Sequence, residues 1–156
     1  MNRIYWAALL MLTFGSAACT PGAVSAPAGA GISGKATIIH VSLIKYAKQS
    51  SPYGEVAGYS PNVVTIQHGS TVQFVNDDTF SHTASSVGTS GFPSGDPFSN
   101  SALTQSGKDL ADANWSSGSL QGNTASQTFS ANTPGTYYFG CFYHYATPMR
   151  GVIVVQ

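Results

Sequence analysis

Charged side chains are scarce in this sequence. Six Lys and Arg residues and six Asp and Glu residues make up only 8% of the 156 residues, and the formal net charge is zero. A nucleic-acid-binding surface needs clustered basic side chains, and a polyanionic docking face needs clustered acidic ones. The composition supports neither, so we expect no nucleic-acid partner.

Long hydrophobic runs are also lacking. The most apolar stretch near the N-terminus, residues 4–14, is too short to span a bilayer as a stable helix. It follows Arg3 and precedes the small residues Ser16-Ala17-Ala18, the order typical of an export signal. Residues 1–18 are therefore predicted to be a signal peptide, and the protein to reach the periplasm or the outer face of the membrane.

Cys19 directly follows this signal and leaves two processing routes open. The segment resembles a bacterial lipobox, in which Cys19 would be lipidated and would tether the protein to a membrane, although that motif usually has Leu where Ser16 stands. The alternative is ordinary cleavage near Ala18 or at Ala26. Residues 19–34 contain Pro, Ala and Gly without charge or periodicity, so we expect a flexible linker before a folded domain at residues 35–156.

The remainder predicts an all-β fold, a Greek-key β-sandwich of seven to eight short strands separated by turn residues. Residues 62–67 and 71–76 are separated by a short Gly-containing turn and are expected to pair as a hairpin. Residues 85–114 show little pattern, with a short helix expected around residues 100–112. The other expected strands are residues 36–44, 115–120, 126–129, 136–142 and 151–155.

One segment near the C-terminus, TPGTYYFGCFYHYATPMRG at residues 133–151, carries the chemistry. Cys141, His144 and Met149 follow one another as C-x2-H-x4-M. A thiolate, an imidazole and a thioether suit copper, and two His with one Cys and a weak axial Met make a blue-copper site. His82 is the candidate for the second histidine. The alternative, that Cys141 is a buried inert thiol, is less favoured because an unpaired thiol is a hazard after export unless it is held as a thiolate.

With these residues in place, the chain resembles the small cupredoxins of the plastocyanin, pseudoazurin and amicyanin kind. The resemblance rests on residues 60–86, 118–144 and 148–156. It implies one type 1 copper ion per chain, bound by His82, Cys141, His144 and Met149, and single-electron transfer between redox partners without catalysis. It also implies that the backbone N–H of Thr83 supports the cysteine sulfur, and that Asn76 ties the His82 loop to the Cys141 loop.

The sequence departs from plastocyanin at one docking face. Plant plastocyanin has a tyrosine immediately before its cysteine, where this chain has Gly140, and residues 85–95 contain no acidic residue. We therefore expect redox partners to dock at the His144 end, over apolar neighbours, and we expect a monomer. These neighbours are Phe142, Tyr143, Tyr145, Ala146, Pro148 and Met149.

Two other classes of copper protein use ligands of these types. A module that stores or delivers copper would use the same ligands but would need an accessible, labile site. A multicopper enzyme would need further copper ligands, and only His40 and His68 remain, on different expected elements. We therefore predict that the protein is not an enzyme.

Overall fold

The structure, a computed structural model, describes residues 34–156. The predicted signal peptide and residues 19–33 of the predicted linker lie outside this range, so these assignments stay predictions. Among the described residues, none of the helical structure has the length and hydrophobicity needed to span a membrane.

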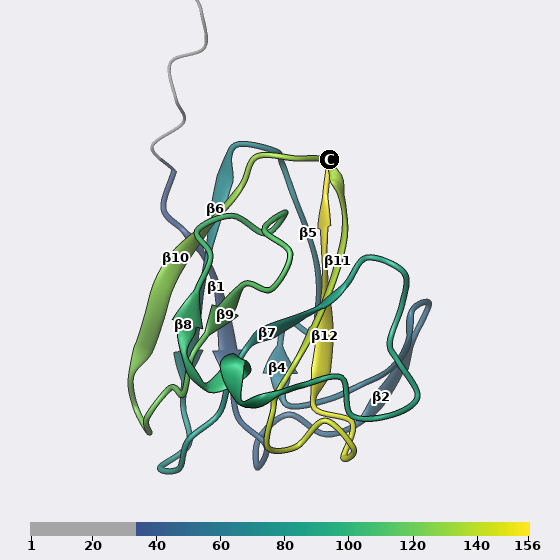
Figure 1. The fold of residues 1–156 in the computed structure, drawn as a ribbon, viewed down its shortest axis with the longest axis vertical. Coiled ribbons are helices and arrows are strands. Elements are labelled where there is room, and N and C mark those ends of the chain that lie inside the picture. The colour runs from purple at the N-terminus through teal and green to yellow at the C-terminus, as the bar shows by residue number, and fades with distance from the viewer. Residues whose placement is uncertain (1–33) are drawn as a thin grey trace, which may run out of the picture. The chain divides into compact units, whose positions relative to one another are not determined.

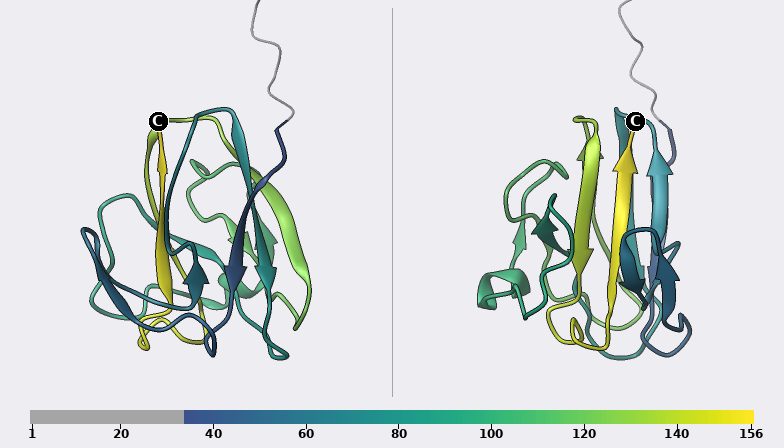
Figure 2. Two further views of the ribbon diagram at one scale, coloured as in Figure 1. Left: turned by 180° about the vertical axis from the view of Figure 1, so that it is seen from behind. Right: turned by 90° about the vertical axis from the view of Figure 1, so that its right-hand side faces the viewer.

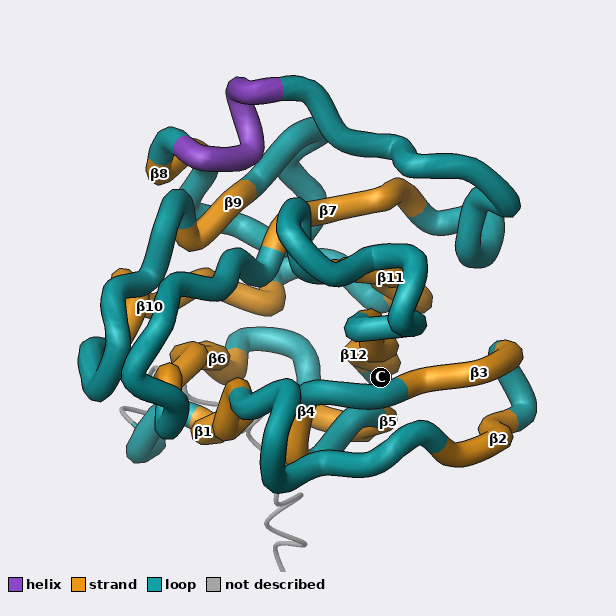
Figure 3. The backbone as a smooth tube through the Cα atoms, turned by 90° about the horizontal axis from the view of Figure 1, so that it is seen from below, coloured by secondary structure: helices purple, strands orange, loops and turns teal. Residues whose placement is uncertain are grey.

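The described residues form two main β-sheets, as the sequence predicts (Figures 1 and 2). Figure 3 shows the two sheets from the lower end of Figure 1. The smaller sheet has the order β10 (Ala125–Ala131), β6 (Ser70–Asn76), β1 (Thr37–Val41), β4 (Tyr59–Ser60). The larger has the order β5 (Val63–Ile66), β12 (Arg150–Val155), β11 (Gly135–Gly140), β7 (Ser85–Gly88), β9 (Ser116–Ser117), β8 (Gln105–Ser106).

The predicted strand number is close to the number of longer strands. Among residues 34–156, seven strands have four or more residues, and five strands have two or three. The short ones include a separate pair, β2 (Gln49–Ser51) with β3 (Gly54–Val56). The expected helix near residue 100 is a single 3-10 turn, η1 (Asn100–Leu103).

The predicted hairpin between residues 62–67 and 71–76 is wrong. β5 pairs in parallel with β12 in one sheet, and β6 pairs with β1 and β10 in the other. The turn between them therefore crosses from one layer to the other. Its backbone N–H groups bind the ends of other strands, from His68 to Gln156 O (2.7 Å) and from Gly69 to Ala131 O (2.8 Å).

The two sheets enclose an aromatic core. The ring of Phe74, on β6, lies 5.2 Å from that of Phe139 on β11, and 6.0–6.3 Å from those of Tyr59, Trp115 and Phe129. All five side chains are 0–1% exposed. The alternation that places Phe74 inward also buries Asn76 at the end of β6, where the chain turns toward His82.

Candidate metal centre

His82 is carried by a turn that follows β6. The chain leaves the sheet after Asn76, and His82 then forms an isolated bridge to Leu120, with N–H···O distances of 3.1 and 2.8 Å in the two directions. Its side chain is completely buried. This two-way backbone pairing with Leu120 thus fixes the position of the ligand candidate.

Cys141 lies at the end of β11, and a tight loop brings His144 and Met149 back beside it. The N–H of His144 donates to Cys141 O (3.2 Å), that of Met149 to His144 O (3.1 Å), and that of Cys141 to Met149 O (3.0 Å). The loop joins strands β11 and β12, which pair antiparallel up to Gly140 and Arg150. It is the yellow loop at the lower end of the sandwich in Figure 1.

The structure brings His82, Cys141 and His144 together. One nitrogen from each ring and the sulfur all lie within 4.8 Å of one another, and Sγ is 3.7 Å from His82 Nδ1 and 3.6 Å from His144 Nδ1. With bonds of roughly 2.0–2.3 Å from nitrogen and sulfur to a first-row metal ion, ligands spread around one plane are about 3.6–3.8 Å apart. The donor set and its spacing therefore fit a copper ion of the type 1 kind.

Met149, the fourth predicted ligand, is also buried. Its side chain is 0% exposed and belongs to the same buried cluster as Cys141. Gly58, which has a positive φ of +74°, leaves the room that this side chain fills. A Cβ there would lie 3.0 Å from Met149 Cε and 3.1 Å from Sδ, so any larger residue would push the thioether away.

Burial shapes the protonation of the cluster. It raises the pKa of the Cys141 thiol, and N–H groups, first that of Thr83, offset part of this rise. Burial lowers the pKa of His144, as does the neighbouring His82. A neutral His144 imidazole has a lone pair available for a metal, and the thiolate would be stabilised by the metal itself.

Thr83 supports the Cys141 sulfur, as the resemblance implies, and also links the His82 turn to residues 141–149, which we call the metal loop. Its N–H lies 3.4 Å from Cys141 Sγ, its Oγ1 accepts the N–H of Phe142 (2.9 Å), and its carbonyl accepts the hydroxyl of Tyr59 (2.6 Å). The expected role of Asn76 is wrong. Its amide donates to Phe80 O (2.8 Å), Leu120 O and Gln121 O, and therefore ties the His82 turn to residues 120–121, not to the Cys141 loop.

A buried carboxylate behind His82 escaped the sequence analysis. Asp78 Oδ2 lies 2.9 Å from His82 Nε2, on the ring side opposite Cys141. Burial raises the pKa of Asp78, but hydrogen bonds from Ser42, His82 and the Leu43 N–H outweigh it, so the pKa is lowered. The only signal in the sequence is the four-residue spacing from Asp78 to His82 in a segment that reads as a solvent-exposed turn.

The patternless residues 85–114 contact the metal loop. Tyr145 donates its hydroxyl to Pro93 O (3.2 Å), and its ring stands edge-on to Phe98 at 5.5 Å. The guanidinium of Arg150 lies 4.9 Å from the Tyr145 ring and 5.1 Å from the Phe92 ring. We call Phe92, Phe98, Tyr145 and Arg150 the aromatic brace, since they hold this segment and the loop together.

Exposed apolar side chains gather at the metal end of the fold. The exposed large hydrophobic residues of the described range are Ile44 (76%), Tyr143 (44%) and Phe80 (38%), all in loops at this end. The rings of Phe80 and Tyr143 lie 6.1 and 6.2 Å from that of His144. We call Phe80, Tyr143, Ala146 and the partly exposed His144 the apolar rim. Tyr145, Pro148 and Met149, which the sequence placed near His144, are buried and do not contribute to it.

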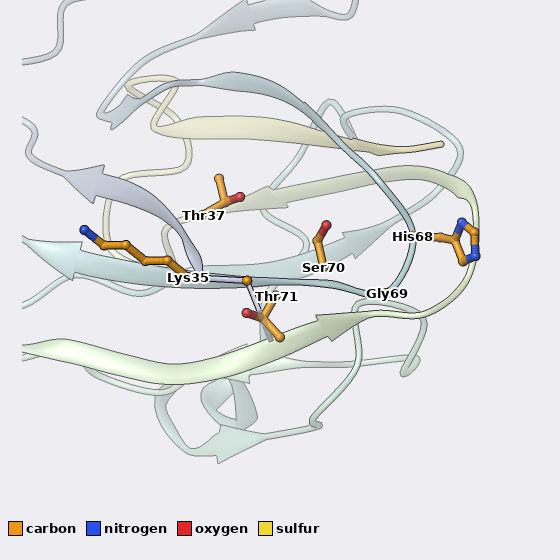
Figure 4. A pocket seen from close by; sticks show the side chains of 7 residues that line it. Lys35, Thr37, His68, Gly69, Ser70 and Thr71 are labelled. Carbon is orange, nitrogen blue, oxygen red and sulfur yellow. The ribbon is translucent and has the colours of Figure 1, made fainter. Parts of the chain in front are cut away.

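The two remaining histidines lie apart from the cluster. His40 Nδ1 is 3.1 Å from Asp77 on the protein surface. His68 lines a cavity of about 150 Å³ at the end of the sandwich where β6 begins, opposite to the end that carries His82. Figure 4 shows that the side chains of Lys35 and His68 extend in opposite directions there, so they do not form a common binding site.

A search of curated proteins found no match. Similar solved structures include a purple cupredoxin from Nitrosopumilus maritimus (20% identity, 77% of this chain and 99% of that one, TM-score 0.48). They also include a reduced amicyanin variant (18% identity, 78% of this chain and 82% of that one, TM-score 0.49). A third is a copper-containing nitrite reductase from Thermus scotoductus (19% identity, 78% of this chain and 22% of that one, TM-score 0.48).

The family described as copper binding proteins, plastocyanin/azurin family, matches residues 48–156, which include the whole metal cluster. The prediction of a non-enzymatic copper protein agrees with this match. The chain belongs to the plastocyanin/azurin family of copper-binding proteins.

Proposed function

We propose that the protein is an exported carrier of single electrons, with His82, Cys141, His144 and Met149 as the ligands of one copper ion. Bound copper would supply the reversible change between Cu(II) and Cu(I). Family membership and the grouping of the donors support this proposal. Its export through residues 1–18 and a lipid tether at Cys19 concern residues outside the described range.

The observation that carries the proposal is the unequal burial of the four side chains. Cys141, His82 and Met149 are 0% exposed, whereas His144 is partly exposed within the apolar rim. A partner could thus approach one ligand ring while the other three donor side chains stay buried. Electron transfer is favoured by such a route, whereas copper delivery is favoured by a more accessible site.

Voltammetry on the purified copper-loaded protein tests the proposal. We expect a fast, reversible one-electron wave, because buried ligands held by paired strands need little rearrangement. We also expect copper to remain bound for hours in a mild chelator. Loss of copper within minutes, together with a slow or irreversible wave, would contradict the carrier function and favour copper delivery.

Partners are proposed to dock on the apolar rim. Arg150 is the only charged side chain from Cys141 to the C-terminal residue, and it is held in the aromatic brace. Fields between exposed charges are screened beyond about 8–10 Å at physiological salt, so a charge-guided encounter slows as salt rises. We expect the rate of electron transfer to a soluble redox protein to change little across a salt series in stopped-flow measurements.

The variant Ala146→Asp should slow this transfer, because it places a charge in the rim. Ala111→Asp is the matched control, since Ala111 is also exposed but lies far from the rim. The N–H of the preceding residue, Leu110, donates to Ser130 O, at the end of β10 that is remote from His82. A wild-type rate that falls about tenfold or more with salt would indicate a charged docking face instead. Equal slowing in the two variants would also count against the rim.

A further inference from the structure

The buried pair of Asp78 and His82 defines which ring nitrogen carries the proton. Their side chains are 2% and 0% exposed, and the carboxylate, which can only accept, faces Nε2 at 2.9 Å. Nε2 must therefore hold the hydrogen. When the ring binds a metal ion, the available lone pair is therefore on Nδ1, the nitrogen that lies 3.7 Å from Cys141 Sγ.

The carboxylate is held rigidly, but without a neutralising cation. Ser42 Oγ donates to Oδ1, the N–H of Leu43 donates to Oδ2 (2.8 Å), and the N–H of Asp78 itself donates to Asn76 Oδ1 (3.0 Å). All of these donors are neutral. Within residues 34–156 no Lys or Arg pairs with Asp78, whereas the neighbouring Asp77 pairs with Lys45 at 3.7 Å.

We propose that Asp78 is a positioning residue for His82 that also biases the metal centre toward Cu(II). It orients the ring and fixes the metal-binding tautomer. Its negative charge attracts Cu(II) more strongly than Cu(I). Because the charge is buried and uncompensated, this difference is larger than it would be for a charge in water. The proposal rests on the assignment of His82 as a copper ligand, but not on electron carriage.

The charge is tested with Asp78→Asn. Asparagine keeps the shape and an oxygen that can accept from His82 and Leu43. It removes the negative charge and places an amide NH2 opposite Ser42 Oγ, which as a hydroxyl can accept as well as donate. Mutating a side chain that hydrogen-bonds a metal-bound histidine typically lowers the metal affinity about 10- to 100-fold. We expect Cu(II) binding to weaken at least tenfold relative to Cu(I) binding in competition titrations. Each tenfold change in this ratio corresponds to a rise of 59 mV in the one-electron reduction potential.

Asp77→Asn is the matched control. It makes the same charge change one residue away, on a carboxylate that is 20% exposed and paired with His40 and Lys45. We expect a much smaller shift of the potential. Equal shifts in the two variants, or an unchanged potential in Asp78→Asn, would overturn the proposed bias.

The tautomer is tested without metal or activity. In ¹⁵N NMR spectra of the metal-free wild-type protein, Nε2 of the His82 ring should carry a hydrogen. Asp78→Ala should give a mixture of tautomers, while Asp78→Asn should retain the wild-type form. A wild-type Nε2 without a hydrogen would overturn the positioning role, even if a variant fails to fold.

Discussion

Replacing Cys141 with serine is expected to abolish the strong visible absorption of the Cu(II) protein. That absorption arises from charge transfer between a thiolate sulfur and Cu(II), and Cys141 Sγ is the sulfur that lies between the two histidine rings. Serine keeps the size and removes the sulfur, so the colour should be lost completely whether or not copper still binds. Absorption spectra recorded with copper content measured on the same samples check this result.

The other cysteine provides the control. Cys19 and Cys141 are the two cysteines of the chain, and Cys19 precedes the folded domain. Cys19→Ser should leave the visible spectrum unchanged. If wild-type protein binds one Cu(II) without strong visible absorption, the type 1 assignment is wrong.

Introducing at position 140 the tyrosine that precedes the cysteine in plant plastocyanin is expected to destabilise this protein. A Cβ on Gly140 would lie 2.7 and 3.0 Å from ring atoms of Tyr145 and 3.2 Å from Met149 O. Tyr145 cannot easily move, since Pro93 and Phe98 hold its ring. Overpacking of this kind costs about 1–3 kcal/mol, so Gly140→Ala should lose about that much and Gly140→Tyr more.

Denaturant unfolding of the metal-free protein measures this loss, and transfer of copper to a chelator should be faster in both variants. Gly135→Ala is the matched control on the same strand, because its Cβ would approach other atoms no closer than 3.4 Å. It should change the free energy of unfolding by less than about 1 kcal/mol. Wild-type stability in Gly140→Ala would show that the Tyr145 ring does not fill this space.

The sequence predicted the metal centre better than its surroundings. Cys141, His144 and Met149 lie in one loop at fixed spacing, so their chemistry could be recognised locally. Asp78 could not, because a carboxylate in a polar turn looks like a solvated one until the packing of Ser42 and Leu43 buries it. Burial depends on contacts between residues about 35 positions apart, and no local pattern reports them.

The same limitation explains the errors in the fold. Alternating residues on either side of a glycine turn predict a hairpin equally well whether the strands pair or enter different sheets. Here β5 enters the larger sheet because β12 offers it a parallel edge. The partners of Phe92 and Phe98 were likewise invisible, since each contacts rings about fifty residues later in the chain.

The aromatic brace makes the copper loop a poor candidate for transplantation. In a loop exchange, residues 141–149 would arrive in a new scaffold without Phe98 and the carbonyl of Pro93, which contact Tyr145 in this protein. Phe92, which contacts Arg150 at the end of the loop, would also be missing. A foreign loop placed here would, conversely, leave these aromatic rings without their partner. A loop exchange that keeps these contacts must therefore transfer two segments that are distant in sequence, residues 92–98 and residues 140–150, together.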